Sequence, residues 1–412
     1  MQFSRRTNWN TEESELARAH RLRAQAGLPI ADLTASNPTR CGFTYPPELL
    51  SALADPAALD YDPQPRGSLA ARQAVCGYYA RHGVALSPEQ LVLTTSTSEA
   101  YSFLFRLLCD PGNEILVPQP GYPLFDYLAV LDDVRIRPVS LVYDHGWQID
   151  PEAFRQAIGP QSRAIMLVHP NNPTGHFTQP WEARELGRLC REHGLSLIVD
   201  EVFLDYSFSE TARSFAAGIE GVPVFVVSGM SKIAGLPQMK AAWIAATGPD
   251  REAALERLEV IADTFLSMNA PVQCALPAWI DSCGEVQAQI RQRTQTNLAE
   301  LDRQLVRLPA VQRLVAGGGW YAVLRIPALE PDEQTVLELL ERGVWVQPGY
   351  FFGMAPSGWL VVSLLAPVDE FSTGVTRLVD DLGTNQEGNV TLPRGKVFVE
   401  VFDRKVLKKS KI

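Results

Sequence analysis

Short apolar runs alternate with amphipathic stretches through most of the first 250 residues. Residues 91–94, 164–169 and 195–199 are almost continuously apolar, which is typical of strands that are covered on both faces. Residues 182–193 lie between the last two runs and repeat their apolar positions with helical spacing. This alternation predicts an α/β fold in which helices flank a mostly parallel sheet.

Capping and turn residues predict the other elements of this region. A helix is expected at residues 11–26, where Thr11 opens a capping signature. Residues 31–40 are expected to form a short strand that enters an Asn-Pro turn. Further helices are expected at residues 69–82 and 99–108, and further strands at residues 115–117 and 224–227.

After about residue 250 the alternation gives way to a long charged stretch, residues 251–307, that is predicted to be helical. Strands are expected after it at residues 320–325, 344–347 and 359–364, with a helix at residues 332–342. This order predicts a smaller α+β domain on a connecting helix. We therefore expect an N-terminal arm with part of the small domain (1–45), a large domain (46–265), a small C-terminal domain (266–383) and a tail of uncertain structure (384–412).

The tail differs in composition from the rest of the chain. In residues 384–412, Lys and Arg outnumber Asp and Glu by seven to three, and residues 397–402 (VFVEVF) form a β-prone stretch. No function follows from these features.

Composition restricts the class of protein. The 412 residues are 46% hydrophobic and 20% charged, which suits a globular chain with two domains and a large core. The formal net charge of −10 argues against a nucleic-acid partner and against a membrane surface. Six scattered cysteines without a CxxC pair indicate a reducing compartment, and neither a signal peptide nor a membrane-spanning run is visible. We therefore expect a cytoplasmic protein, and we predict no metal site.

Polar side chains follow several of the predicted strands. In parallel sheets, ligands bind beyond the carboxyl ends of the strands, so these side chains are candidates for one site. They are Ser96, Thr97, Ser98, Tyr122, Asn171, Asn172, Asp200 and Lys232.

Lys232 lies in a Ser/Gly/Met turn directly after a buried strand. Poor solvation there lowers the pKa of an ammonium group, and the neutral amine is a nucleophile. A lone lysine is more often an ordinary surface residue, so the assignment depends on the motifs around it.

Seven motifs occur in a specific order between residues 61 and 240, within a resemblance that covers about residues 8–382. Each is weak alone, but together they resemble the pyridoxal phosphate-dependent aminotransferases of class I and II, with the aspartate aminotransferase-like fold type I. The motifs are YDPQPRG (61–67), LTTSTSEA (93–100), PQPGYPLF (118–125), HPNNPTG (169–175), VDEVF (199–203), SGMSK (228–232) and GLPQMK (235–240).

The resemblance implies roles for the central residues. Lys232 would form a Schiff base with the cofactor and then move a proton between the substrate's α-carbon and the cofactor's C4′. Asp200 would pair with the protonated pyridine nitrogen, although a helix cap or a salt bridge would also explain a buried carboxylate. Asn172 would donate to the ring oxygen, beside a cis peptide before the following proline, or it would serve only the turn.

The resemblance also implies how the cofactor's phosphate and ring are held. Ser96, Thr97 and Ser98 would bind the phosphate at a helix N-terminus, unless they only cap that helix. Tyr122 would stack on the pyridine ring, unless it is an ordinary core residue. Tyr61 would reach the phosphate of the neighbouring subunit, which implies a homodimer with shared active sites, unless it packs within its own loop.

Three positions near these motifs depart from the family pattern. Gly229 replaces a serine, and Lys240 replaces an arginine, which keeps the charge at the phosphate but loses the bidentate fork. Phe203 replaces the tyrosine that donates to the ring oxygen. We therefore predict that the Schiff base titrates at a higher pH than in typical relatives.

Val361 stands where relatives carry the arginine that binds the substrate's α-carboxylate. Another arginine, Arg40 or Arg66, would replace it, or Asn172 with backbone N–H groups would suffice, or the substrate lacks that carboxylate. We predict Ser36, Arg40 and Asn172 as substrate-binding residues.

The leading prediction is an aminotransferase that moves an amino group from an amino acid to a 2-oxo acid. A pyridoxal phosphate-dependent lyase or decarboxylase of the same fold is the alternative, because a fold does not fix the chemistry. A cofactor-dependent binding module is the weakest option, because both Lys232 and Asp200 are present. Nearby apolar and aromatic residues favour a neutral or hydrophobic substrate side chain; they are Phe43, Tyr45, Phe351 and Phe352.

Overall fold

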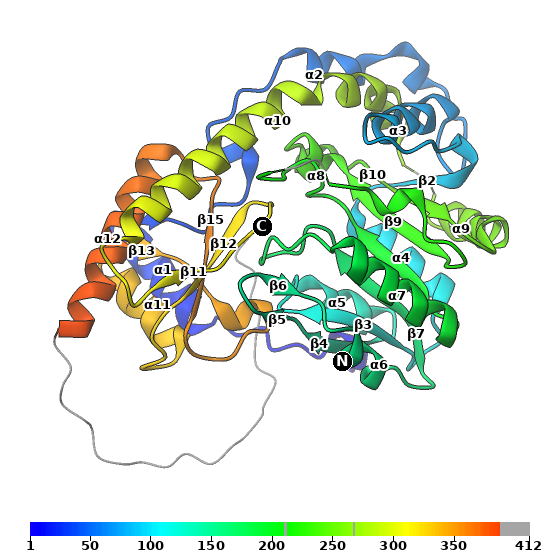
Figure 1. Cartoon of the computed structure of the whole chain (residues 1–412). Coiled ribbons are helices and arrows are strands. Elements are labelled where there is room, and N and C mark those ends of the chain that lie inside the picture. The colour runs from blue at the N-terminus through cyan, green and yellow to red at the C-terminus, as the bar shows by residue number, and fades with distance from the viewer. Residues whose placement is uncertain (210–211, 267, 388–412) are drawn as a thin grey trace. The chain divides into compact units, whose positions relative to one another are not determined.

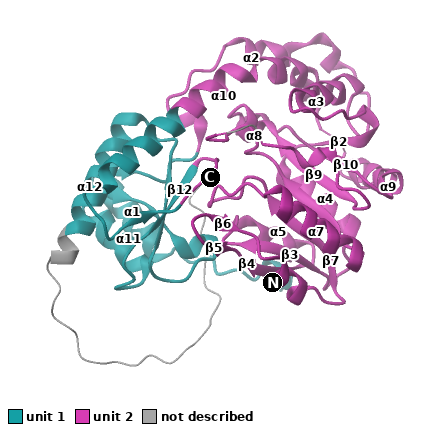
Figure 2. Cartoon of the chain, in the orientation of Figure 1, with its two compact units in different colours: residues 1–36, 293–314, 321–412 teal, residues 37–292, 315–320 magenta. Residues whose placement is uncertain are grey.

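The computed structural model describes residues 1–209, 212–266 and 268–387, and it divides into two compact units (Figure 1, Figure 2). Unit 2 contains residues 37–292 and 315–320, and unit 1 contains the described residues on either side of them. The β-prone stretch at 397–402 lies outside the described residues. In the described part of the chain, every helix is too short or too polar to cross a membrane.

Unit 2 is built on a seven-stranded sheet with the order β2-β10-β9-β8-β7-β3-β4. β10 pairs antiparallel with both of its neighbours, and the remaining pairs are parallel. The sheet is therefore mixed but mostly parallel, as the sequence predicts. Its strands are β2 (Leu91–Thr94), β3 (Glu114–Gln119), β4 (Arg135–Ser140), β7 (Ser162–Val168), β8 (Ser196–Asp200), β9 (Val224–Gly229) and β10 (Ala242–Thr247).

Helices bury both faces of this sheet. Alternate strand residues such as Ile198 and Ile244 pack into one core with α4 (Thr97–Leu108) and α9 (Arg251–Thr264). On the opposite face, Trp243 donates a hydrogen bond of 3.1 Å to Tyr79 of α3. The other elements of unit 2 are α2 (Glu48–Ser51), α3 (Leu69–Arg81), α5 (Leu124–Leu131), β5 (Val142–Tyr143), β6 (Trp147–Gln148), α6 (Pro151–Ala157), α7 (Pro180–His193) and α8 (Met230–Ile233).

Unit 1 contains a four-stranded sheet with the order β11-β12-β15-β14 and a separate parallel pair, β1 with β13. The long helix α10 (Ala270–Leu305) begins in unit 2 and ends in unit 1. The other elements of unit 1 are α1 (Glu15–Gln25), β1 (Ala31–Asp32), β11 (Gln312–Arg313), β12 (Tyr321–Arg325), α11 (Asp332–Glu341), β13 (Val344–Trp345), β14 (Gln347–Pro348), β15 (Trp359–Ser363) and α12 (Val368–Glu387).

Several predicted boundaries are wrong. Ser14 rather than Thr11 caps α1, because the Ser14 side chain accepts from the Ala17 N–H. The predicted helix at 251–307 is two helices, α9 and α10, and the predicted strand at 344–347 is β13 and β14 in different sheets. The predicted strand at 115–117 extends through Pro118 to Gln119, since β3 pairs with β7 only as far as Leu116 and needs no donor beyond it.

Candidate active site

The sheet brings the ends of five strands to one edge. Ala242 of β10 lies opposite both Thr94 of β2 and Gly229 of β9, so β2 and β9 run in the same direction and end together. Asp200 at the end of β8 lies between Val168 of β7 and a residue of β9. β3 is parallel to β7 and ends at the same edge. The predicted residues after these strands therefore emerge along one edge of unit 2.

Asp200 is a buried carboxylate with a small number of partners. It accepts hydrogen bonds from the Tyr101 hydroxyl and from the Val202 N–H, the latter at 2.9 Å. Burial raises the pKa of Asp200 to about 6, although both hydrogen bonds and the positive charge of Lys232 oppose the shift. The site therefore keeps a carboxylate that ionises close to neutral pH.

Lys232 lies in α8, the single helical turn that follows β9. Desolvation lowers the pKa of Lys232 to about 8, and the charge of Asp200 opposes this shift. Its Nζ lies 5.1 Å from the ring centroid of Trp320 and 5.9 Å from that of Phe203. The amine is thus neutral in a large fraction of molecules at mildly alkaline pH.

Tyr101 was missed by sequence reasoning, and the only signal for it was its place on the buried face of α4. It lies one turn after Thr97, and its hydroxyl donates to Asp200. Its ring packs 5.1 Å from Phe125, which in turn packs 5.5 Å from Tyr122. Aromatic packing therefore connects Tyr122 with the carboxylate of Asp200.

Asn172 lies in the turn after β7, and the peptide between Asn172 and Pro173 is cis. Its side chain is buried, and Oδ1 has no hydrogen-bond partner among the described residues. The turn itself is closed by other groups, since the Thr174 hydroxyl donates to Asn171 at 2.8 Å. The Asn172 amide is therefore available to a ligand rather than required by the turn.

Glu182 stabilises the chain that follows this turn through hydrogen bonds to its carboxylate. Its fully buried carboxylate accepts from the Ile149 N–H (2.7 Å), the Gln179 N–H (2.6 Å) and His176 (2.8 Å). Three bonds to one carboxylate fix where the chain leaves the turn.

Ser96 caps α4 by accepting a hydrogen bond of 3.1 Å from the Glu99 N–H. Thr97 and Ser98 form the first turn of that helix and are half-buried. Lys240 is exposed in a left-handed conformation (φ 55°), two residues before Ala242, which lies opposite Thr94. A positive charge and a helix N-terminus therefore lie at the same edge, and both attract anions.

The remaining predicted residues belong to other segments of the chain. Tyr61 is 85% exposed, and Arg40 is exposed in the turn at Pro38–Arg40. Arg66 forms an ion pair of 2.6 Å with Glu259. Ser36 and Val361 belong to unit 1, where Val361 is fully buried in β15.

Close packing explains the glycine at position 229. A Cβ atom there would lie 2.8 Å from both the Ala241 carbonyl oxygen and the Ala242 Cβ. The neighbouring strand β10 therefore excludes the serine that the family pattern carries at this position.

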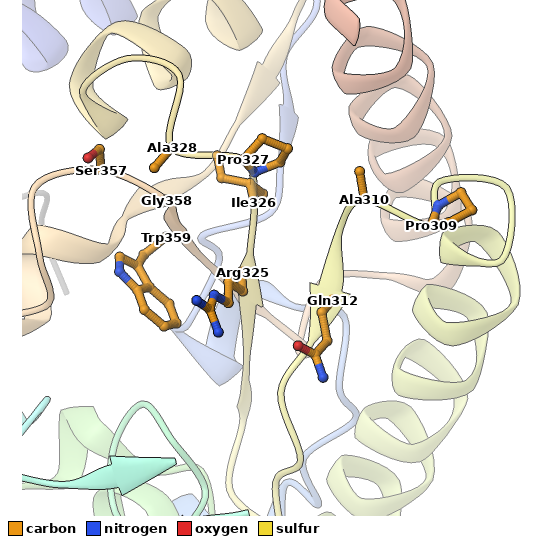
Figure 3. Close-up of a pocket in the computed structure, with 10 residues that line it drawn as sticks. All are labelled: Pro309, Ala310, Gln312, Arg325, Ile326, Pro327, Ala328, Ser357, Gly358 and Trp359. Carbon is orange, nitrogen blue, oxygen red and sulfur yellow. The ribbon is translucent and has the colours of Figure 1, made fainter. Parts of the chain in front are cut away.

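Unit 1 has a pocket of its own, with a volume of about 490 Å³ (Figure 3). Its lining comes from Pro309, Ala310 and Gln312 and from residues 325–328 and 357–359. The Arg325 guanidinium lies 5.7 Å from the ring centroid of Trp359 (Figure 3). All the residues that line this pocket belong to unit 1, whereas Asp200 and Lys232 belong to unit 2.

Fold and site together define a class of protein. A mostly parallel sheet carries a partly neutral amine and a buried carboxylate at its strand ends, beside the N-terminus of a helix. Such an arrangement is typical of an enzyme that uses an amine as nucleophile and proton carrier.

Comparison with known proteins identifies the protein family within this class of enzymes. Residues 45–377 match the model of the family described as aminotransferase class I and II. The chain belongs to this family, and it is an enzyme that transfers amino groups.

Individual relatives agree with this assignment. An alanine aminotransferase of Mycobacterium tuberculosis is 28% identical over 365 residues, 84% of each chain. A tyrosine aminotransferase of Dictyostelium discoideum is 24% identical over 343 residues, 79% of this chain and 81% of the relative. The structure of an alanine aminotransferase from Pyrococcus furiosus covers 93% of this chain and 100% of its own, with a TM-score of 0.85 at 22% identity. The predicted fold class, fold type I, is thereby confirmed.

Proposed function

We propose that this aminotransferase uses pyridoxal phosphate to move an amino group from an amino acid to a 2-oxo acid. The observation that carries the proposal is the presence of Lys232 and Asp200 at one edge of the sheet, close enough for each charge to act on the pKa of the other. Burial moves the pKa of Lys232 down to about 8 and that of Asp200 up to about 6. Each group is then able to change its protonation near neutral pH.

The residues at this edge fit the chemical groups of the cofactor. The Lys232 amine suits an aldehyde, and the Asp200 carboxylate suits a protonated ring nitrogen. The first turn of α4 and the Lys240 charge suit a phosphate. The buried Oδ1 of Asn172 has no partner in the described chain, so no hydrogen bond of that oxygen prevents the amide N–H from donating to the ring oxygen.

Bound pyridoxal phosphate supplies an electron sink next to the substrate's α-carbon. Asp200 holds the proton at the ring nitrogen, and Tyr101 supports Asp200 through its hydroxyl. Lys232 carries the proton to and from the reacting carbon, because its lowered pKa makes both proton transfers accessible. Tyr122 and Asn172 orient the ring from the ends of β3 and β7.

The substrate's carboxylate needs another cationic partner, because Val361 stands at the position where relatives carry the arginine that binds it. Arg66 is already paired with Glu259, so Arg40 is the better candidate. Ser36 belongs to the same proposed substrate site. The aromatic residues near Arg40 favour a donor with a neutral or hydrophobic side chain.

The proposal also includes a homodimer in which Tyr61 contacts the phosphate site of the partner subunit. The high exposure of Tyr61 supports this homodimer, since the ring has little to pack against within its own chain. The proposal further includes the predicted domain limits at residues 45, 265 and 383, and a cytoplasmic location. All six cysteines are free in the structure, which is compatible with a reducing compartment.

Covalent capture of the cofactor tests the central claim. Residues 1–395 contain only two lysines, Lys232 and Lys240, so the modified position is easily mapped. Apoprotein treated with pyridoxal phosphate and then borohydride should carry the added mass on Lys232, and the K232A variant should not. Modification of Lys240 alone, or a K232A protein that still binds the cofactor covalently, would contradict the proposal.

Substrate exchange tests the reaction. With a suitable amino acid the loaded protein should change to the absorbance of pyridoxamine phosphate, and a 2-oxo acid should reverse the change. A screen of amino acids would identify the donor. Release of a keto product without pyridoxamine phosphate would instead identify a lyase.

A further inference from the structure

Three aromatic residues, Phe203, Tyr206 and Trp320, surround Lys232, and we call them the aromatic cluster. The Lys232 Nζ lies over the rings of Trp320 and Phe203. Those two rings meet edge to face, 5.2 Å apart at 75°. Aromatic faces attract cationic amines within about 6 Å, and tryptophan does so most strongly. The cluster therefore acts on the reacting atom of the site.

Backbone hydrogen bonds place Trp320 at this position. The Gly319 N–H donates to the Tyr206 carbonyl at 2.8 Å, and the Gly317 N–H donates to the Gly175 carbonyl at 3.0 Å. Gly175 has φ 68°, and a Cβ atom there would overlap the Gly318 carbonyl oxygen. The segment before Trp320 is therefore tied to the Asn172 turn and to the chain after β8.

Tyr206 links the tryptophan to the backbone that carries the lysine. Its hydroxyl donates to the carbonyl oxygens of Lys232 (2.7 Å) and Ile233 (3.1 Å). Its ring packs 5.2 Å from that of Trp320. Tyr206 thus contacts both the backbone from which the Lys232 side chain begins and the Trp320 ring that lies near the Lys232 amine.

The aromatic cluster carries no hydroxyl at position 203. Phe203 has no donor with which to orient either the cofactor or the amine. Trp320 is fully buried, and its indole N–H has no hydrogen-bond partner in the described chain. Its contribution near the lysine therefore comes from the face and edge of its ring.

We propose that Trp320 is a positioning residue that holds the Lys232 amine over its indole face, in the orientation from which the lysine captures the cofactor and moves the substrate's proton. This inference rests on the proposed function. Without the ring, the four rotatable bonds of the lysine side chain would be free to sample other orientations. Capture and proton transfer would then be slower, while the fold would remain.

Two substitutions separate this role from ordinary packing. W320F keeps an aromatic face and loses no hydrogen bond, whereas W320L removes the aromatic face. The matched control is W359L, which removes a tryptophan of unit 1 from beside Arg325. Thermal melting of each variant measures the cost to folding separately.

The assay follows the rate of covalent capture by the apoprotein. The Lys232 amine adds to the aldehyde carbon of pyridoxal phosphate, the oxygen leaves as water, and borohydride then reduces the resulting C=N bond to a stable secondary amine. Rates are compared on the alkaline plateau, where the amine is neutral in every variant. The cation–π attraction is absent there, so a difference in rate reports how far contact with the indole ring restricts the orientation of the lysine side chain.

We expect the plateau rate to fall about twofold to threefold in W320F and about tenfold in W320L, with W359L unchanged. The kcat for amino transfer should fall in the same order while KM changes little. Equal rates in wild type and W320L, or an equal loss in W359L, would overturn the inference and leave the proposed function intact. Failure of the wild-type protein to capture the cofactor on Lys232 would overturn the proposed function itself.

Discussion

At the scale of single residues, the site depends on a buried carboxylate, Asp200, and a half-buried amine, Lys232, whose pKa values have moved toward each other. Desolvation is the main cause for both Asp200 and Lys232, and their mutual attraction only reduces the shifts. A buried carboxylate and a desolvated amine are costly in the absence of a ligand. A charged cofactor that contacts both groups would offset this cost.

Substituting Tyr101 with phenylalanine should change the pH dependence of cofactor binding. The Tyr101 hydroxyl favours the ionised form of Asp200, so Y101F should raise the Asp200 pKa above about 6. Affinity for pyridoxal phosphate falls as pH decreases through that pKa, because the ring nitrogen loses its anionic partner. The midpoint of this loss should move up by about one pH unit. Titration of the apoprotein with the cofactor from pH 5 to 9 measures it, and an unchanged midpoint would show that Tyr101 does not act on Asp200.

Arg40 and Arg66 are distinguished by their partners. Because Glu259 already neutralises Arg66, R66Q should leave the KM for the amino donor within about twofold of wild type. R40Q should raise that KM about tenfold or more, since an arginine–carboxylate pair is a strong, directional contact. Steady-state kinetics with the donor found in the screen decide the question. The reverse order would assign the carboxylate to Arg66.

At the scale of secondary-structure elements, the spacing of β9 and β10 limits what position 229 accepts. G229S would restore the residue of the family pattern, but its Cβ would lie 2.8 Å from the Ala241 carbonyl oxygen and from the Ala242 Cβ at the start of β10. We expect a loss of about 1–3 kcal/mol in the free energy of unfolding, because the strand pair must separate or shift.

Chemical denaturation measures this loss, and G284A is the control. Gly284 lies on an exposed position of α10 with open space around it, so G284A should be neutral or slightly stabilising. A G229S protein as stable as wild type would show that β10 moves aside at little cost.

At the scale of the whole molecule, the exposed loop around Tyr61 raises the question of assembly. Leu59 is 90% exposed and Tyr61 is 85% exposed in the single chain. Large apolar side chains that are exposed together are typical of surfaces that contact a partner. In the proposed homodimer, that partner is a second copy of the chain.

Mixed dimers test whether the active site is shared. K232A lacks the amine, and Y61F lacks a phosphate donor and should bind the cofactor more weakly. If Tyr61 serves the partner, a K232A/Y61F heterodimer contains one site with both groups intact. About half of its sites should therefore bind pyridoxal phosphate with wild-type affinity, as measured by titration of doubly tagged dimers. Wild-type affinity in none of the sites would place Tyr61 in its own subunit's site.

The amino-acid sequence by itself determined the fold class and the order of the site motifs. Continuous apolar runs identify buried strands such as β2 and β8, because a strand covered on both faces tolerates few polar side chains. Polar residues directly after such runs, among them Asp200 and Lys232, are predictable because the carboxyl ends of parallel strands meet at one edge.

Only the tertiary structure decided which distant side chains meet these residues. Tyr101 lies 99 positions from Asp200 and Trp320 lies 88 from Lys232 in the sequence, and no local pattern distinguishes either from an ordinary core aromatic. The antiparallel strand β10 was not predicted, although its packing excludes a side chain at Gly229. Hydrophobic periodicity records whether a position is buried, whereas the identity of its neighbours depends on strand order and helix packing, which periodicity does not encode.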